Sequence, residues 1–403
     1  MYVTRPLSLY KKSPEALSLP PPQGPHSGIL VIQDDEQEKP SSSSSSSSCF
    51  GFGDFHEVKE LPFPQNQKTE LFYRSGISVN RATHYHQVAF IPVLGHPLSS
   101  NLYYVVHPNG KHRGAYSSLE EEELDTFCFF NSVSIEPNLP LDINNAHQVF
   151  EIFPQRSSVT FRKGFSAKSA AQDTYVPKFL NRRWRVSASA SSDSSLGEAA
   201  GVDDALRARL PEFDFSLANR TSEGVVVGKW YCPFMFIKEG THKTLREEMR
   251  KPMFYEMTLE QRWEQVFSCE NHSGTQKDVV VVDAIVQKEK VVISGWEAML
   301  DERDLTEGFL WFKSQNNFGQ ESSVGLSKGI VERMKWEEER FGWNNGNERQ
   351  VRVKKVEEFE GTNGWKKFGC YVLVERFALK RMDGSLVLTC DFKHTHQMRS
   401  KWE

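Results

Sequence analysis

The sequence of 403 residues lacks a long apolar run. Its longest apolar stretch, VVVVDAIV, contains Asp283 and is far shorter than the roughly 18 residues that a membrane-spanning helix needs. The first residues, MYVTRPLSLYKKSPEALSLPPP, contain no unbroken apolar segment of the kind found in a signal peptide. We therefore expect a soluble protein without a transmembrane segment, located in the cytoplasm, with the nucleus as an alternative compartment.

Cysteine is scarce, and charge of either sign is not in large excess. The six cysteines show no CxxC spacing and no disulfide framework, so we expect those in apolar strands to be free core residues. The net charge of −4 argues against the basic surface of a nucleic-acid-binding protein. The predicted partner is therefore a protein or a small molecule, and the sequence does not indicate an oligomeric state.

Strand patterns dominate what is present. Apolar and aromatic segments bounded by turn residues recur from GILVI at 28–32 to SLVLTCDFKHTHQM near the end of the chain. Helical spacing is confined to a few places, chiefly VDDALRARLP and KGIVERMKWEEER. We expect the second helix to be capped by Ser327 and to place Ile330, Val331 and Met334 on its inner face. The sequence predicts an α+β fold dominated by antiparallel sheets, sandwich-like or barrel-like, with a few short helices.

Composition divides the chain into predicted domains. Residues 1–56 form a proline-rich segment with one strand and a disordered poly-Ser loop at 34–50, since a run of eight serines cannot pack into a core. Residues 57–186 form a β-rich N-terminal domain and residues 221–403 a β-rich C-terminal domain. Residues 187–220 are the linker, with a short helix. Two pairs of segments resemble each other: the pair KWYCPFMFI and MFYEMTLEQRWE is similar to the pair FGCYVLVERF and LTCDFKHTHQMRSKWE. This similarity indicates a duplicated hairpin, but it does not establish a repeat architecture.

Two His-x-His pairs are the candidate metal ligands. Alternate residues of a strand share a face, so His394 and His396 are expected to point to the same side. With His84 and His86 they would supply four imidazoles, enough for zinc or iron. The alternative is that they are ordinary strand residues, because spacing fixes no acidic ligand beside them and the pairs lie far apart in sequence.

Gly325 to Gly329 fits the G-x-S-x-G pattern of a hydrolase nucleophile, with Ser327 as the candidate. That motif needs a buried strand before it and a helix after it. The helix is predicted, but the preceding QESSV does not look like a strand. Asp383 and His394 or His396 would complete the order Ser, Asp, His. The alternative role for Ser327 is a helix N-cap. No dinucleotide cofactor is predicted, because Gly51-Phe-Gly53 lacks the third glycine of that fingerprint.

Several long segments occur together in a familiar order: FIPVLGHPLSSNLYYVV, VVGKWYCPFMFIKE, MFYEMTLEQRWEQVF, GLSKGIVERMKWEEERFGW and FGCYVLVERFALKRMDGSLVLTCDFKHTHQMRSKWE. With them the chain resembles the plant-specific family of the domain of unknown function numbered 1262, over nearly its whole length. The resemblance implies a plant source and a link to stress or defence responses, and it supplies no catalytic residue or cofactor. The leading interpretation is a non-catalytic binding or interaction module. A metal-dependent enzyme using zinc or iron and a serine hydrolase are the alternatives.

Overall fold

The computed structural model describes residues 1–34, 55–76, 82–108, 113–119, 142–156, 163–190, 196–240, 252–271, 278–301, 308–344, 346, 348–362 and 364–403. Within these ranges strands predominate and helices are short. This confirms the predicted strand-dominated α+β fold with antiparallel sheets. The predicted poly-Ser loop, apart from Asp34, lies outside the described residues.

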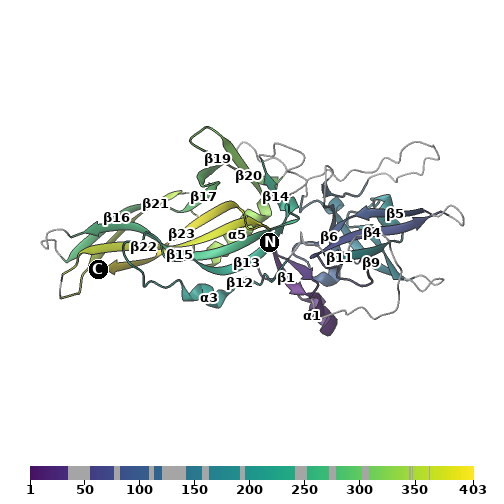
Figure 1. The fold of residues 1–403 in the computed structure, drawn as a ribbon, viewed down its shortest axis with the longest axis horizontal. Coiled ribbons are helices and arrows are strands. Elements are labelled where there is room, and N and C mark those ends of the chain that lie inside the picture. Colours follow the sequence, from purple (N-terminus) through teal and green to yellow (C-terminus); the bar gives the residue numbers. More distant parts are fainter. Residues whose placement is uncertain are drawn as a thin grey trace.

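One large sheet forms the elongated half of the molecule, in the order β14-β20-β19-β18-β17-β23-β22-β15-β13-β1-β2, with β12 beside β13 (Figure 1). Its neighbours pair antiparallel, except that β1 and β2 run parallel. The strands are β1 (Tyr2–Pro6), β2 (Gly28–Ile32), β12 (Gly201–Val202), β13 (Val225–Pro233), β14 (Ile237–Glu239), β15 (Phe254–Glu270), β17 (Glu289–Ile293), β18 (Trp296–Leu300), β19 (Phe309–Gln315), β20 (Glu321–Ser327), β22 (Lys367–Arg381) and β23 (Leu386–Trp402). The first two strands therefore complete a sheet whose other members come from the second half of the chain.

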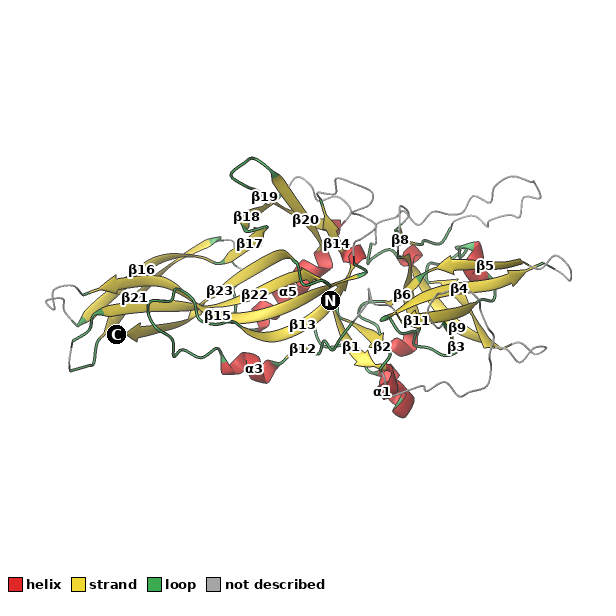
Figure 2. Ribbon diagram, in the orientation of Figure 1, coloured by secondary structure: helices red, strands yellow, loops and turns green. Residues whose placement is uncertain are grey.

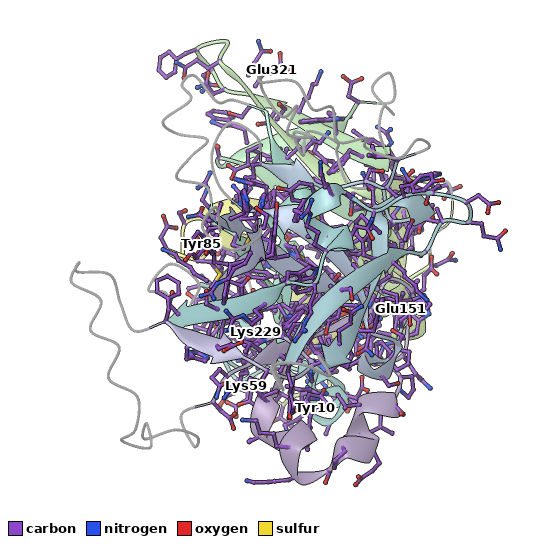
Figure 3. The ribbon with its side chains drawn as sticks, turned by 90° about the vertical axis from the view of Figure 1, so that its right-hand side faces the viewer. Tyr10, Lys59, Tyr85, Glu151, Lys229 and Glu321 are labelled. Carbon is purple, nitrogen blue, oxygen red and sulfur yellow. The ribbon has the colours of Figure 1, made fainter. Side chains whose placement is uncertain are left out.

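Two smaller sheets pack together at the other end of the molecule (Figure 2). The first contains β6 (Ala89–Pro92), β7 (Leu102–His107), β8 (Gly114–Ala115), β9 (Val149–Arg156) and β10 (Lys163–Ser169). The second contains β3 (His56–Val58), β4 (Gln67–Ser75), β5 (Ala82–Gln87) and β11 (Arg185–Ala190). Their shared core is aromatic, with the Phe90 and Trp184 rings stacked at 5.6 Å and Phe63 against both. Tyr85, on the edge strand β5, is exposed on this end (Figure 3).

A two-stranded ribbon of β16 (Val279–Gln287) and β21 (Gln350–Glu358) covers the distal end of the long strands. Alternate residues of β16 divide between two faces. The inner face buries Val280 and Val282 against Phe368 and Trp365. The outer face of the ribbon is open to solvent.

The helices are short: α1 (Leu7–Lys12), α2 (Lys178–Asn181), α3 (Asp204–Arg209) and α5 (Lys328–Arg340), with 3-10 turns η1 (Pro14–Ser18), η3 (Leu98–Ser100), η4 (Ala146–Gln148) and η6 (Phe234–Phe236). In the described part of the chain, none has both the length and the apolar character that crossing a membrane requires. The predicted helix after Ser327 is confirmed as α5. Its expected side-chain cap is not, because the Ser327 hydroxyl makes no capping hydrogen bond.

The two faces of the long strands differ in chemistry. On the outer face, Asp391 accepts hydrogen bonds from Arg376 Nε at 2.6 Å and Arg262 Nη2 at 2.8 Å. On the inner face, apolar rows such as Leu259, Phe377 and Cys390 are buried. Helices α3 and α5 supply the charged side chains that meet this inner face. These charged side chains form a polar cluster on the inner face of the sheet.

Candidate functional site

Three acid or imidazole side chains from three elements converge in the interior. Glu375 comes from β22, His394 from β23 and Glu338 from α5. His394 Nε2 lies 2.9 Å from Glu338 Oε2 and 3.2 Å from Glu375 Oε2, and all three side chains are 0% exposed. One donor atom from each lies within 4.8 Å of the other two.

Ordinary strand and helix periodicity places these groups. The antiparallel register puts Glu375 between Gln261 of β15 and Phe392 of β23, on the inner face of the sheet. The next row contains Trp263, Leu373 and His394. In α5, Glu338 follows Met334 by four residues and so lies on the same buried helix face. The polar cluster is therefore an interruption of an otherwise apolar inner face.

Arg207 of α3 completes the cluster from the other side. Its Nε donates to Glu375 Oε1 at 2.8 Å and its Nη2 donates to Glu375 Oε2, a bidentate pair. The Arg207 Nη2 lies 3.6 Å from Glu338 Oε1, and its guanidinium stacks on the Phe341 ring at 4.2 Å. Gln261 Nε2 donates to Glu375 Oε1 at 2.8 Å. Glu375 is thus held by charge-assisted hydrogen bonds in a site closed to water.

The network continues along α5. Glu337 accepts from Arg333 Nη2 at 2.6 Å and from Arg340 Nε at 2.5 Å, and Arg340 Nη2 donates to Asp204 at 2.7 Å. Arg333 Nη1 donates to the Gln23 carbonyl at 2.6 Å, which ties the N-terminal segment to the helix.

The charges of this network balance when His394 and Glu338 hold one proton between them. The four carboxylates are Asp204, Glu337, Glu338 and Glu375, and the three guanidiniums are Arg207, Arg333 and Arg340. Three guanidiniums and one imidazolium equal four carboxylates. If both groups lost that proton, the network would contain one uncompensated negative charge, which is unfavourable in the interior.

The pKa directions agree with this balance. Burial alone would lower the pKa of His394, but its hydrogen bonds to Glu338 and Glu375 outweigh burial and raise it to about 9. Burial and then the charge of Glu375 raise the pKa of Glu338 to about 8. Burial opposes ionisation of Glu375, but the hydrogen bonds from Arg207 and His394 hold its pKa well below the usual range. At neutral pH the cluster therefore retains a proton between His394 and Glu338.

The same donors could hold a divalent cation. One imidazole and two carboxylates suit zinc or iron, and His394 Nδ1 and Glu338 Oε1 have no hydrogen-bond partner among the described residues. A divalent ion would have to displace the shared proton beside Arg207. It would then leave the network with one excess positive charge. Electrostatics therefore favours the protonated network over a metal centre.

His396 lies beside His394, with the two ring centroids 5.4 Å apart in an edge-to-face arrangement, but it is not enclosed by the protein. The pairing of β22 with β23 shifts between Leu373↔His394 and Val372↔Met398, so His396 lies within a β-bulge between these two positions. His394 is buried, whereas His396 is exposed. The two imidazoles thus lie side by side, but the donor cluster found among the described residues contains His394 and not His396.

His84 and His86 lie on β5, in a different sheet from His394. The His84 ring stacks on Tyr73 at 4.9 Å, and its Nε2 lies 2.7 Å from Ser75 Oγ. The His86 ring stacks on Phe179 at 4.8 Å. Within the described ranges, the donor cluster around His394 contains neither residue. The two His-x-His pairs are therefore not brought together.

Ser327 lies at the junction of β20 and α5. The preceding strand, which the sequence did not indicate, is present as Glu321–Ser327, so the strand and helix of the hydrolase motif both exist. However, Ser327 is only 6% exposed, and among the described residues its hydroxyl has no hydrogen-bond partner. His26, whose Nε2 lies 2.7 Å from Glu332 Oε2, lines the same small cavity.

The predicted partners of Ser327 are engaged elsewhere. Asp383 accepts a hydrogen bond from the Ser385 amide in the turn between β22 and β23. His394 is paired with Glu338. The expected Ser, Asp, His arrangement is therefore not assembled.

Sequence reasoning missed Arg207, Glu338 and Glu375. Two signals could have found the carboxylates. Glu375 occupies the strand position between Leu373 and Phe377, where an apolar side chain is expected. Glu338 continues the helical spacing of Ile330 and Met334. No sequence pattern pointed to Arg207, because its guanidinium bonds to residues that are more than a hundred positions away in the sequence.

Comparison with known proteins gives three findings. The family model described as "Protein of unknown function (DUF1262)" matches residues 23–129, which confirms the expected resemblance over that part of the chain. No curated protein matches the sequence. Among solved structures, the crystal structure of Cry35Ab1 is similar with a TM-score of 0.43 and 9% identity, covering 84% of this chain and 90% of that one. A likeness of this degree carries no argument about function.

Proposed function

We propose that the chain is a non-catalytic binding protein whose docking surface is the outer face of the β16–β21 ribbon. The observation that carries this proposal is the exposure of apolar side chains on a regular strand pair. Val279, Val281, Ile285 and Val356 are 42%, 60%, 70% and 62% exposed. Clustered exposed apolar side chains with polar neighbours are typical of interaction sites.

The charges on this face compensate one another within the ribbon. Asp283 lies on the same face as Val281 and Ile285 and accepts hydrogen bonds from Arg352 Nε and Nη2, each at 2.6 Å. The apolar side chains therefore surround a neutral pair. The other charged side chains on this face, Lys354 and Glu358 opposite Asp283 and Val279, have opposite signs, so a partner that covered the face would meet no net charge.

A metal-dependent enzyme using His394, Glu338 and Glu375 is the second candidate, because three donors converge there. That function requires a substrate to reach the donors. All three side chains are 0% exposed and already paired, which supports a structural role for the cluster. A hydrolase at Ser327 has less support, since its hydroxyl is buried and the predicted acid and imidazole lie elsewhere.

Photo-crosslinking tests the docking surface. With p-benzoylphenylalanine in place of Val281, we expect a protein adduct in plant cells, because that side chain faces outward at the centre of the ribbon. The matched control is Val226, which is 50% exposed on β13. The adduct at 281 should disappear with Ile285→Lys and persist with Leu386→Lys. Equal labelling from 281 and 226 would contradict the proposal.

The link to stress or defence responses is part of the same proposal and rests on the family resemblance. The crosslinking experiment extends to it directly, by comparing cells before and after a pathogen or abiotic challenge. We expect the amount or identity of the adduct to change with the challenge. An adduct that is identical in both conditions would contradict the stress link while leaving the docking surface intact.

A further inference from the structure

We infer that the β4–β5 hairpin is a second binding site, where single-stranded nucleic acid stacks its bases on exposed rings of β5. The site lies apart from the β16–β21 ribbon, so the inference does not rest on the docking role proposed there. Among the described residues β5 pairs with β4 alone and is therefore an edge strand. Figure 1 shows the two strands together at the end of the molecule away from the C-terminus.

A column of stacked groups crosses the outer face of this sheet. The register places Arg185 of β11, Phe72 of β4 and Tyr85 of β5 in one row. This row points away from the core, because the adjacent Leu71 is buried and successive strand residues face opposite sides. The Arg185 guanidinium lies 4.5 Å from the Phe72 ring centroid, and the Phe72 and Tyr85 rings stack with centroids 6.0 Å apart. Tyr85 ends the column at the sheet edge and is 61% exposed, so a base stacked on it would extend the column by one ring.

A second column has the same order on the opposite face. The Arg182 guanidinium lies 5.7 Å from the Tyr73 ring centroid, and the Tyr73 and His84 rings stack with centroids 4.9 Å apart. His84 is exposed. Both columns thus begin at an arginine and end at an exposed ring of β5, at the neighbouring positions His84 and Tyr85. Exposed rings backed by arginine are typical of sites for unpaired bases, because every base presents a π face.

Local charge favours a polyanion at this end, although the chain as a whole carries a net charge of −4. Residues 163–190 contain six lysines or arginines and one aspartate, and residues 55–76 contain three charges of each sign. On the outer face, exposed Lys68 and Arg74 lie on β4 at even spacing from Phe72. The net charge that argued against nucleic acid is therefore an average that conceals a basic end, and a phosphate backbone complements this end.

Two acidic side chains lie near the outer column. Glu57 pairs with Arg185, with its Oε1 3.3 Å from Nη1, so its charge is compensated. Glu70 lies two positions before Phe72 on the same face of β4 and is half-buried. Glu70 therefore opposes the phosphate backbone, but the basic residues of this end outnumber it.

The open shape of the hairpin favours an extended ligand. Small-molecule sites are concave, whereas five of the six residues of β5 are exposed. A single strand of nucleic acid can follow such a surface and contribute phosphate charge and ring stacking together. A duplex offers less, because its bases are already stacked on one another.

Fluorescence anisotropy of the full chain with labelled oligouridine and oligothymidine of about twelve nucleotides tests the inference. We expect both probes to bind at low salt and to be released as the salt concentration rises. Tyr85→Ala should weaken binding by about fivefold or more, because one base loses its stacking partner, and Tyr85→Trp should bind like the wild type. Arg74→Ala should weaken binding and lower its salt dependence by about one counterion. Tyr175→Ala is the matched control, because Tyr175 is 43% exposed and belongs to neither column.

Three results would overturn the inference. The first is a wild-type chain that binds neither probe at low salt, and the second is a Tyr85→Ala protein that binds as tightly as the wild type. The third is equal affinity for a duplex of the same length, since attraction to phosphate alone needs no exposed ring. Val281→Lys, on the ribbon, should bind the probes like the wild type, so failure here leaves the proposed docking surface intact. Circular dichroism of each variant confirms that the fold is retained.

Discussion

Replacing Arg207 with alanine should lower the free energy of unfolding by about 3–5 kcal/mol, the range measured when one partner of a buried ion pair is removed. The Arg207 side chain is 1% exposed and pairs with Glu375, which is 0% exposed. Without the guanidinium, a carboxylate would remain in the interior with fewer compensating groups. Urea denaturation, monitored by tryptophan fluorescence, measures the loss.

Two further variants make this result specific. Arg352→Ala removes an equally well-formed bidentate pair from the surface, where solvent screens the charges, and should change stability little. A double variant, Arg207→Met with Glu375→Leu, removes both charges together and should recover much of the loss, since apolar replacements of buried pairs are often neutral. An Arg207→Ala protein as stable as Arg352→Ala would contradict the network described here.

Stability should decrease as the pH rises from about 6.5 through 9. The folded-state pKa of His394 is raised from 6.5 to about 9, so its contribution is fully present below pH 6.5 and is lost as the pH passes the folded value. The raised pKa of Glu338 acts in the same direction, because the folded cluster binds a proton that the unfolded chain releases. At 1.36 kcal/mol per pKa unit, the difference between 6.5 and about 9 corresponds to on the order of 3 kcal/mol.

Denaturation curves at a series of pH values measure this loss, and His394→Gln supplies the comparison. Glutamine can donate a hydrogen bond to Glu338 but cannot hold the extra proton. The variant should be less stable at pH 6.5, and the double variant His394→Gln with Glu338→Gln, which removes both sites for the proton, should show a much flatter profile up to about pH 9. His396→Gln is the matched control, because His396 is exposed, and should keep the wild-type slope. A double variant with the same slope as the wild type would refute the assignment.

Much of the fold follows from local pattern. The long strands β15, β22 and β23 coincide with apolar and aromatic segments of the sequence, and the turn between the last two contains Gly384 at a φ of 84°, which glycine adopts without strain. The two similar hairpin segments lie next to each other in the large sheet, as the order β23-β22-β15-β13 shows. By contrast, the addition of β1 and β2 beyond β13 joins segments some two hundred residues apart, and no local pattern specifies such a contact.

The candidate site was only partly predictable, for the same reason. His394 was identified from its strand, but its partners come from a distant helix and from the neighbouring strand. Strand parity was a partial guide. It predicted that His396 would lie beside His394, and the two rings are 5.4 Å apart, but a bulge that no sequence pattern announced leaves His396 exposed and outside the donor cluster of the described residues. Sequence periodicity therefore located one member of the cluster and missed the charges that determine its chemistry.

The central claim is that a proton, rather than a metal ion, completes the cluster around His394, so that the interior is structural and the chain acts through its surface. Elemental mass spectrometry of the purified wild-type protein, beside the His394→Gln variant, tests this most directly. We predict no stoichiometric zinc or iron in either protein, including after incubation with these metals and desalting. One equivalent of metal in the wild type that is absent from the folded variant would contradict the claim and favour the metal-dependent enzyme.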